Sequence, residues 1–393
     1  MCKAYFCVER SFPGGDAGAN RVLFMAKALQ TVGWDVFVIS TGHAKEEHFS
    51  EEKGIYVYQG VPYQTVPEIG LKKLGRVVRR LRADKETIDI LKRQGLEKED
   101  VVIIYSSSYS YTKNIMTYVN ARGIRVVVDV VEWHQSFQFQ FGVVDYRYIL
   151  YKKCFENVYP KSYGVIAISK CLEEHFREIG CKTIVYPIFV DSRTPLQYKK
   201  KEDNILHLIY PGNPYRKDSL VTMLKALNLL SEKEKQRVIF HLTGVSIKHL
   251  YSCIPGDEKI LDVLVQNGTV EIHSWMEYSE LLQLYHIVDF ALIARPENLV
   301  TKANFPSKVP ELMNKGIVPI INPVGDIADY LSDGNDALFF PVCSEESCRD
   351  AIRRCLDLDP EDIYHMREQA KRTAQQRFDY RTSGAALSDF LRG

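Results

Sequence analysis

The residues best suited to chemistry lie in one short run, Asn304–Ile321, which reads Asn-Phe-Pro-Ser-Lys-Val-Pro-Glu-Leu-Met-Asn-Lys-Gly-Ile-Val-Pro-Ile-Ile. Ser307 is a suitable helix N-cap, Pro310 fits the first turn, and Gly316 can end the helix before a β-branched strand. Lys308 then stands at the positive end of the helix dipole, which disfavours a cation unless an anion binds there. We therefore expect a phosphate group at this helix start.

Glu311 lies one turn further along the same helix. It cannot complete a capping box with Ser307, because the position three residues after Ser307 holds Pro310. Its carboxylate can therefore accept hydrogen bonds from a ligand, and the two hydroxyls of a ribose are the natural candidate beside a phosphate. The alternative is that Ser307, Pro310 and Gly316 only mark the ends of a helix.

A second pair of cations precedes another expected helix. The loop Pro-Gly-Asn-Pro-Tyr-Arg-Lys-Asp follows the strand-like run Ile205–Tyr210 and carries Arg216 and Lys217. A solvated loop needs neither cation at this position, whereas a diphosphate would bind both. Gly212 and Asn213 precede them, and we expect this loop to bind the same anion as Lys308.

Polar residues also follow the expected strands of the N-terminal half. Ser107 and Tyr109 come after one strand, and Trp133 and His134 after the next. Ligands of open parallel sheets bind outside the carboxyl ends of the strands. Ser107 and Tyr109 therefore either line a pocket or cap the following helix, and His134 is either a ligand contact or an ordinary loop residue.

Gly14, Gly15 and Gly18 form a glycine-rich loop between the first expected strand and the first helix. Such a loop lets the backbone approach a phosphate or a sugar closely. The spacing does not fit the dinucleotide fingerprint G-x-G-x-x-G. The loop alone is a weak signal.

The run Asn304–Ile321 resembles the nucleotide-sugar site of retaining GT-B glycosyltransferases of family 4, the glycosyl transferases group 1 type. The resemblance is strong over residues 205–345 and fainter over residues 3–191. It implies that Lys308 contacts the donor diphosphate and that Glu311 contacts the ribose. It also implies that Lys217 and Arg216 assist departure of the diphosphate, and that His134 positions the donor sugar or supports an oxyanion.

The resemblance assigns further positions around these residues. Asp129 and Glu132 are expected to orient His134, and Gly14 and Gly15 to lie beside the acceptor and the donor diphosphate. Ser107, Tyr109 and Trp133 are then expected on the acceptor side. The remaining expected donor contacts are Gly212, Asn213, Glu297, Asn298, Asn304 and Ser307.

The sequence departs from the family pattern at two positions. Asn213 stands where the family usually has an arginine, and Arg216 is the nearest substitute. Ala303 stands where many members carry an acid that grips a hydroxyl of the donor sugar, eight residues before Glu311. One of the nearby polar residues Glu297, Asn298 and Asn304 is expected to replace it, so the sugar stays open.

Strand-like apolar runs alternate with helix-period segments along all 393 residues, a pattern typical of α/β proteins. With the resemblance, this predicts a GT-B fold, two Rossmann-like domains whose parallel sheets face a central cleft. We expect an N-terminal acceptor-side domain at residues 1–191, a linker at 192–204 and a nucleotide-sugar domain at 205–377. A C-terminal helix at 378–393 is expected to cross back to the first domain.

Charge and cysteine usage exclude several classes of protein. Residues 1–193 hold 27 Lys and Arg against 22 Asp and Glu, and the rest hold 24 against 28, which is too weak and dispersed a basic footprint for nucleic-acid binding. The nine cysteines are scattered and lack a C-x-x-C pair, as in reduced cytoplasmic proteins. The sequence shows no secretory leader and no membrane-spanning run, so we expect a cytoplasmic protein.

The run Leu71–Arg82 contains six Lys and Arg and no acid, with leucine and valine at helical spacing. It predicts a basic amphipathic helix. The helix either packs on the sheet with solvated charges or docks on an anionic membrane surface, where each basic residue contributes about 1 kcal/mol.

Together these features predict a retaining hexosyltransferase that moves a sugar from a nucleotide-diphosphate donor, with a lean to UDP, to a glycan or lipid-linked acceptor. No cofactor or metal is expected, because the one D-x-D, Asp357–Asp359, falls at a helix end. A glycosidase would need two carboxylates that flank the bond, and no such pair is apparent. A GT-B sugar-nucleotide epimerase and a catalytically weak partner subunit remain alternatives.

Overall fold

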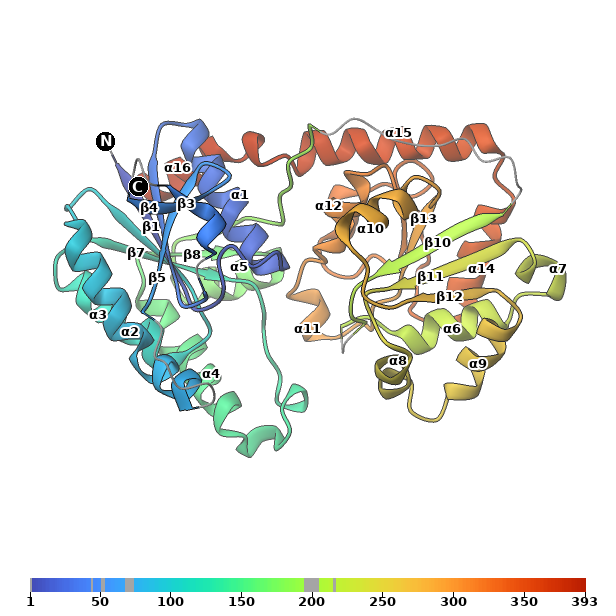
Figure 1. Cartoon of the computed structure of the whole chain (residues 1–393), viewed down its shortest axis with the longest axis horizontal. Coiled ribbons are helices and arrows are strands. Elements are labelled where there is room, and N and C mark those ends of the chain that lie inside the picture. Colours follow the sequence, from blue (N-terminus) through green and yellow to red (C-terminus); the bar gives the residue numbers. More distant parts are fainter. Residues whose placement is uncertain (1, 44, 51–53, 68–73, 194–204, 215–216) are drawn as a thin grey trace. The chain divides into compact units, whose positions relative to one another are not determined.

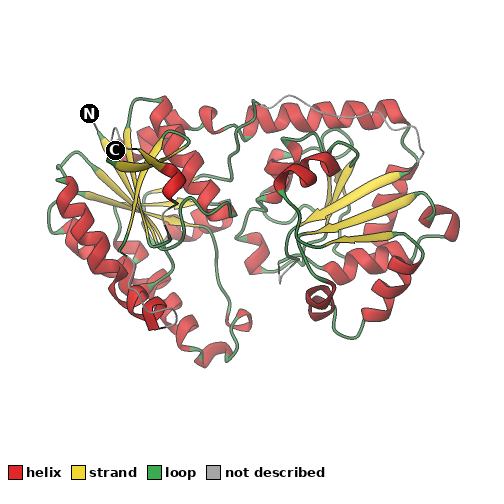
Figure 2. Ribbon diagram, viewed as in Figure 1, coloured by secondary structure: helices red, strands yellow, loops and turns green. Residues whose placement is uncertain are grey.

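The computed structural model describes residues 2–43, 45–50, 54–67, 74–193, 205–214 and 217–393. The chain divides into two compact units, the first formed by Met1–Phe189 with Tyr380–Gly393 and the second by Val190–Asp379. Each unit has a sheet covered by helices (Figures 1 and 2). The sequence analysis placed these boundaries at residues 191 and 378, and residues 194–204 of its linker lie outside the described part.

The sheet of the first unit is ordered β3-β4-β5-β2-β1-β6-β7-β8-β9. Its core strands are parallel, and they are buried along nearly their whole length, as expected where helices cover both faces. The strands are β1 (Lys3–Val8), β2 (Asp35–Ser40), β3 (Phe49–Ser50), β4 (Ile55–Tyr58), β5 (Val61–Thr65), β6 (Val101–Tyr105), β7 (Arg125–Val130), β8 (Gly164–Ala167) and β9 (Thr183–Val185).

Helices connect these strands in the alternating order that the sequence predicts. They are α1 (Ala17–Thr31), α2 (Leu74–Gln94), α3 (Tyr109–Asn120), α4 (Tyr146–Asn157) and α5 (Lys170–Glu178). Short 3-10 turns are η1 (Glu46–His48), η2 (Ser136–Gln138), η3 (Gly142–Val144) and η4 (Tyr159–Lys161). The predicted basic helix Leu71–Arg82 falls at the start of α2, where residues 71–73 and the side chains of 74–81 lie outside the described part.

The antiparallel strands β3, β4 and β5 were not anticipated from the sequence. The run Ile-Tyr-Val-Tyr-Gln-Gly-Val-Pro-Tyr-Gln-Thr carries their signal, alternation interrupted by a turn. Gln59 and Gly60 both have positive φ, 47° and 84°, as a tight hairpin turn requires.

The sheet of the second unit is entirely parallel, with the order β12-β11-β10-β13-β14-β15. Its strands are β10 (Leu206–Pro211), β11 (Val238–Thr243), β12 (Val270–His273), β13 (Phe290–Ile293), β14 (Val318–Ile321) and β15 (Leu338–Phe339). The order reverses at β10, between β11 and β13. Ligands of such sheets bind outside the carboxyl ends of the strands at this switch point.

The helices of the second unit flank this sheet in Figure 2. They are α6 (Leu220–Asn228), α7 (Glu232–Lys235), α8 (Ile247–Cys253), α9 (Glu258–Gln266), α10 (Tyr278–Tyr285), α11 (Leu299–Lys302), α12 (Lys308–Met313), α13 (Ile327–Tyr330), α14 (Glu345–Leu356) and α15 (Pro360–Arg377). The D-x-D pair caps helices here, since Asp359 accepts from Glu361 N and Asp362 N at 2.9 Å. Within the described part of the chain, none of the helices combines the length and apolar character that a membrane crossing needs.

The C-terminal residues pack on the first unit. After the turn η5 (Tyr380–Thr382), α16 (Gly384–Arg392) lies against α1. A Cβ at Gly384 would stand 2.4 Å from Ala28 O, so this close contact needs glycine. Trp34 Nε1 also donates to Ser388 Oγ at 2.9 Å, which secures α16.

A buried lysine fixes the start of the second unit to its last long helix. Lys371 Nζ on α15 donates to Ser192 O at 3.0 Å, Asn314 O at 2.8 Å and Asn314 Oδ1 at 2.7 Å. Asn314 Nδ2 in turn donates to Asp191 O at 2.9 Å. Burial, with the neighbouring charge of Lys315, lowers the pKa of Lys371 to about 8.

This lowered pKa predicts a pH-dependent stability. Between about pH 8 and pH 10 the unfolded chain binds more protons at Lys371 than the folded chain does, so the folded state gains stability as pH rises. The free energy of unfolding of the wild type should therefore rise, relative to Lys371→Met, between about pH 7.5 and pH 9.5. Urea titrations at the two pH values measure this, and Lys248→Met, at an exposed lysine, should show no such trend.

Candidate active site

A charged cluster lies at the carboxyl ends of β10 and β13, where the strand order reverses. Lys308 Nζ, on the first residue of α12, is 3.3 Å from Asp218 Oδ2 and 3.0 Å from Tyr210 OH. Tyr210 OH donates to the same Asp218 oxygen at 2.5 Å. Arg295 Nε lies 3.5 Å from the other oxygen, Oδ1. Two cations therefore share one carboxylate.

Asp218 is ionised in this setting. Burial favours its neutral form, but Lys308 and Arg295 outweigh burial and lower the pKa of the carboxyl group. Burial and the Asp218 charge raise the pKa of Tyr210 well above its usual value, so its hydroxyl stays a donor. The sequence analysis assigned the anion beside Lys308 to a ligand, whereas the protein itself supplies one in Asp218.

Arg295 is the least accessible member of the cluster, with 1% of its surface exposed. Its Nη2 donates to Asn304 Oδ1 at 3.0 Å, while Nε and Nη1 make no hydrogen bond to the described residues. Burial lowers its pKa. Buried guanidinium N–H groups normally have hydrogen-bond partners, so these two nitrogens of Arg295 leave positive charge beside Asp218 that no hydrogen bond from the described part of the chain offsets. Sequence reasoning missed Arg295, although a cation directly after the apolar run Phe290–Ala294 was the available signal.

The start of α12 differs in detail from the prediction. Ser307 stands at the N-cap position but has helical angles, φ −59° and ψ −29°, and its side chain makes no capping hydrogen bond. The predicted capping role of the hydroxyl is therefore wrong. Gly316 ends the helix region as predicted, with φ 69° and its N–H bonded to Met313 O at 2.9 Å. Glu311 is exposed in the first turn.

The structure describes three of the four residues that were expected to bind the anion in the loop after β10. Gly212 has φ 80°, which favours glycine, and its N–H donates to Thr243 O at 2.9 Å. Asn213 Oδ1 lies 2.8 Å from His249 Nε2. Lys217 directly precedes Asp218, while Arg216 lies outside the described residues.

The candidates for replacing the missing acid are not equivalent. Ala303 is fully buried, so no ligand reaches this position. Asn298 caps α11 through Thr301 N at 3.1 Å, and Glu297 forms an ion pair with Lys302 at 2.8 Å. Asn304 alone contacts the charged cluster, through Arg295.

In the first unit, His134 follows β7 and is partly exposed. Its ring nitrogen Nε2 lies 3.3 Å from Glu132 Oε2, and its backbone N–H donates to Tyr151 OH at 3.1 Å. Tyr151 OH donates to Glu132 O at 3.0 Å, and its ring meets the imidazole edge-on at 4.7 Å. Glu132 and Tyr151 therefore fix the position of His134.

Asp129 does not share this role, and the prediction that it orients His134 needs correction. Both its oxygens bind the guanidinium of Arg21, with Nε to Oδ2 and Nη2 to Oδ1 at 2.8 Å. Arg21 Nη1 also donates to Pro187 O at 2.8 Å. The pair is almost fully buried, with side chains 2% and 1% exposed, so it belongs to the core.

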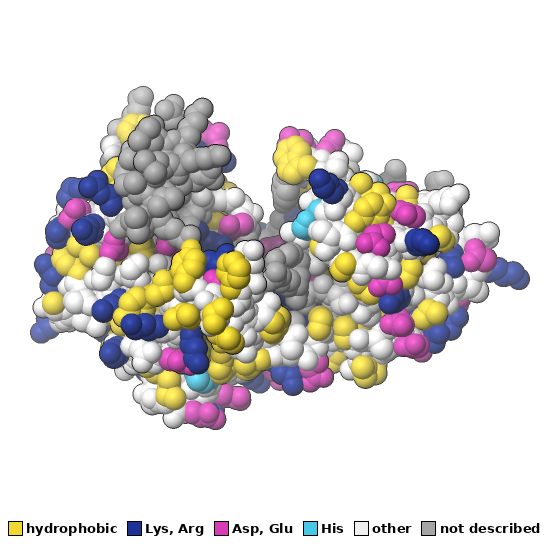
Figure 3. All heavy atoms as spheres, turned by 90° about the horizontal axis from the view of Figure 1, so that it is seen from below, with side chains coloured by type: hydrophobic (Ala, Val, Ile, Leu, Met, Phe, Trp, Pro, Cys, Tyr) yellow, Lys and Arg dark blue, Asp and Glu magenta, His cyan; other side chains and the backbone are white. Residues whose placement is uncertain are grey.

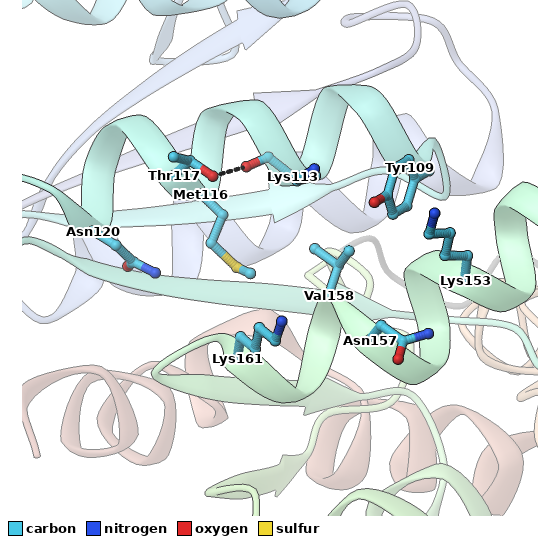
Figure 4. Close-up of a pocket in the computed structure, with 9 residues that line it drawn as sticks. All are labelled: Tyr109, Lys113, Met116, Thr117, Asn120, Lys153, Asn157, Val158 and Lys161. Atoms are coloured by element: carbon cyan, nitrogen blue, oxygen red, sulfur yellow. Dashed lines mark hydrogen bonds between the residues drawn. The ribbon is translucent and has the colours of Figure 1, made fainter.

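The expected acceptor-side residues have different surroundings. Trp133 packs in an aromatic group, 5.1 Å from Phe155 and 4.4 Å from His175 between ring centroids. Ser107 is exposed at the start of α3. Tyr109 lines one end of a groove of about 440 Å³ along α3 and α4, with Lys113, Lys153 and Lys161 among the other lining residues (Figure 4).

The glycine-rich loop leads into α1. Gly14 and Gly15 are exposed, and Gly15 has φ 71°. Asp16 caps the helix by accepting from Ala19 N at 2.8 Å. Because this carboxylate already occupies the helix start, the N-terminus of α1 is a poor place for a phosphate.

Comparisons with known proteins agree with this architecture. Residues 223–389 match a family model described as glycosyl transferase-like. No protein of curated function matches the sequence at a significant level.

Three solved structures cover nearly the whole chain. A glycosyltransferase from Rickettsia africae is 14% identical, with a TM-score of 0.70 and coverage of 100% of this chain and 98% of that one. Anabaena HepE, solved with UDP and glucose, is 14% identical, with a TM-score of 0.67 and coverage of 100% and 99%. WaaG, a glycosyltransferase involved in lipopolysaccharide biosynthesis, is 15% identical, with a TM-score of 0.67 and coverage of 99% and 100%. These similarities confirm the predicted fold class, GT-B.

Proposed function

We propose that this protein is a glycosyltransferase that moves a hexose or related sugar from a nucleotide-diphosphate sugar to a glycan or lipid-linked acceptor. The observation that carries the proposal is the cation excess around Asp218, at the strand ends of the unit that contains most of the glycosyl transferase-like segment. Anabaena HepE was solved with UDP and glucose, which supports a UDP-sugar as the donor to test first.

The cluster suits a diphosphate that gains charge. Lys308 and Arg295 contribute two positive charges and Asp218 one negative charge, so one positive charge remains, and Lys217 directly precedes Asp218. As the bond between sugar and phosphate breaks, negative charge grows on the leaving group. Cations fixed in a buried site stabilise that charge without further rearrangement. Charged side chains of the protein then stabilise the leaving diphosphate, and the residues proposed to assist its departure are Lys217, Lys308 and Arg216.

The other assignments rest on the family resemblance and the local geometry. Glu311 is exposed in the first turn of α12, in the same turn as Lys308, where it can accept from ribose hydroxyls. Asn304 is the proposed sugar contact in place of the missing acid, because it bonds to Arg295. His134, held by Glu132 and Tyr151, is proposed to position the sugar. Retention of the anomeric configuration is inferred from the resemblance alone, and NMR of the product's anomeric proton tests it.

A catalytically weak partner subunit is the second candidate. The buried Ala303 and the pairing of Lys308 with Asp218 favour it, because both reduce the contacts left for a donor. The purified chain decides between the two. Slow hydrolysis of UDP-sugars that disappears in Lys308→Ala would support the enzyme, and its absence with every donor and acceptor tried would support the partner subunit.

A membrane surface is part of the proposal. Large apolar side chains are exposed along the segment from η2 into the first half of α4. Each of them is at least 43% exposed, and they are Phe137, Phe141, Val143, Val144, Tyr146, Ile149 and Leu150. Hydrophobic and basic side chains gather together on the face of the first unit seen in Figure 3. Helix α2 begins within the basic run and packs on α3, and α3 packs on α4, which carries Tyr146, Ile149 and Leu150. Such a combination suits an anionic lipid surface.

The first prediction from the proposed function concerns the charges of the donor site. Lys308→Met should weaken UDP binding by about 1.5 to 3 kcal/mol, because it removes a charged hydrogen-bond donor. Asp218→Asn should instead tighten UDP binding, because it removes the competing negative charge, and should lower the free energy of unfolding. Isothermal titration with UDP and GDP measures both effects. The control is Lys225→Met, which breaks a lysine–aspartate pair elsewhere in the unit; equal affinity in all four proteins would refute the donor site.

The second prediction concerns the ribose. Glu311→Gln should weaken binding of UDP by roughly 1 to 3 kcal/mol, because a neutral amide is a poorer acceptor for the hydroxyls. It should leave binding of inorganic diphosphate unchanged. A loss of the same size for both ligands would assign Glu311 to the phosphates or to the fold, and unchanged UDP affinity would exclude the ribose contact.

The third prediction concerns the lipid surface. The full chain should sediment with vesicles that contain phosphatidylglycerol, and binding should fade with added salt, because exposed charges are screened. Arg79→Glu with Arg80→Glu should abolish the salt-sensitive part. Phe141→Ser with Val144→Ser should weaken binding at every salt concentration, whereas Val263→Ser, at an exposed valine of the second unit, should not. Binding that is absent, or identical in all variants, would remove the membrane from the proposal.

A further inference from the structure

Three histidines lie side by side across neighbouring strands of the second sheet. His207 is on β10, His241 on β11 and His273 on β12. The register pairs His241 with Ile209 on β10 and with Glu271 on β12. Since residues two apart in a strand share a face, His207, His241, Glu271 and His273 all point to the same face of the sheet. They run from the buried interior, where His241 is 2% exposed, to the edge strand, where Glu271 is half exposed.

The outer three residues bring their ligand atoms together. His241 Nδ1 is 3.0 Å from His273 Nε2, and Glu271 Oε2 is 3.3 Å from the first and 3.6 Å from the second. Two ligand atoms bound to one Zn²⁺ at about 2.0 to 2.1 Å stand roughly 2.9 to 3.6 Å apart, for angles between a right angle and 120°. One ion can therefore contact all three atoms with little movement.

His207 supplies the support that a metal-bound histidine needs. Its Nδ1 lies 2.9 Å from His241 Nε2, and the two rings stack with their centroids 5.2 Å apart. A histidine that binds a metal through one nitrogen donates the other N–H to a neighbour, which fixes its tautomer. His207 is itself held by Asp289, whose Oδ2 accepts from His207 N at 3.1 Å.

We propose that His241, Glu271 and His273 form a binding site for a divalent transition metal such as Zn²⁺. The ligand set of two imidazoles and one carboxylate suits this class of ion, and the exposed side of Glu271 leaves room for water as a further ligand. Without an ion, His241 Nδ1 and His273 Nε2 lie 3.0 Å apart, within hydrogen-bond distance of each other. With an ion, both give their lone pairs to the metal, and His241 Nε2–H donates to His207.

The site would stabilise the edge of the sheet next to the donor loops. His273 O and Ser274 O both accept from Gly244 N at 3.0 Å. A Cβ at Gly244 would in turn lie 3.6 Å from Gly212 Cα. An ion that holds the end of β12 therefore fixes the backbone on which the Gly212 loop packs. The proposed role is structural, and the ion takes no part in the transfer reaction.

The test uses the full chain without an affinity tag, treated with EDTA and then dialysed. We expect one equivalent of Zn²⁺ to bind and to raise the thermal midpoint, because a ligand of the native state stabilises it by mass action. Co²⁺ should produce visible ligand-field absorption. His273→Gln and Glu271→Gln, at the more exposed ligands, should each lose affinity by at least about tenfold. His365→Gln is the control, because His365 faces Glu361 at 3.8 Å on an exposed helix surface.

The outcomes separate a metal site from a ladder of hydrogen-bonded histidines. No stoichiometric binding by the wild type, or equal affinity in His273→Gln and Glu271→Gln, would overturn the proposal. Loss of affinity in the control as well would assign the binding to scattered surface histidines and overturn it too. UDP affinity with and without Zn²⁺ measures whether the effect extends to the donor loops, independently of whether the chain transfers a sugar.

Discussion

The second unit depends on the neutralisation of one buried carboxylate. Asp218 has a 10% exposed side chain, so its charge needs partners that replace water. Lys308, Arg295 and Tyr210 supply them from α12, the loop after β13 and the end of β10. The ionic contacts therefore hold together three segments that are far apart in the sequence, at the point where parallel sheets bind ligands.

The first unit also contains a buried carboxylate, Asp129, but a single arginine neutralises it. Asp129 and Arg21 pair one to one, and the remaining guanidinium nitrogen donates to Pro187 O, so the pair has no net charge and each guanidinium nitrogen has a partner within the protein. Around Asp218 the cations outnumber the acid, and two nitrogens of Arg295 make no hydrogen bond to the described residues. Both clusters are charged, but cations are in excess at Asp218, and the proposed function therefore assigns the ligand to that cluster and not to the paired Arg21 and Asp129.

Local pattern predicted most of the fold. Runs such as Val101–Tyr105 and Val238–Thr243 form buried parallel strands, as the alternation of apolar runs and helix-period segments predicts, because their hydrophobicity is nearly continuous. The hairpin of β4 and β5 was missed because it interrupts the alternation of strands and helices. Asp218 and Arg295 are 77 positions apart, and His207, His241 and His273 are separated by 34 and 32 positions. Only the strand order and register bring such residues together, so spacing in the sequence could not reveal them.

The balance of charge around Asp218 also accounts for how a site of this kind stays folded without its ligand. Without a counter-ion, the buried Arg295 and the partly buried Lys308 would repel each other, and Arg295 would bear the cost of leaving water. Asp218 lowers that cost, but it also competes with an incoming anion for Lys308. If the site binds a diphosphate as proposed, that ligand would gain less from binding than it would at two free cations, and the weaker binding would favour release of the product nucleotide. In the proposed function, the carboxylate that stabilises the fold at this point would also weaken nucleotide binding, and the neutral Tyr210 hydroxyl keeps that carboxylate in place.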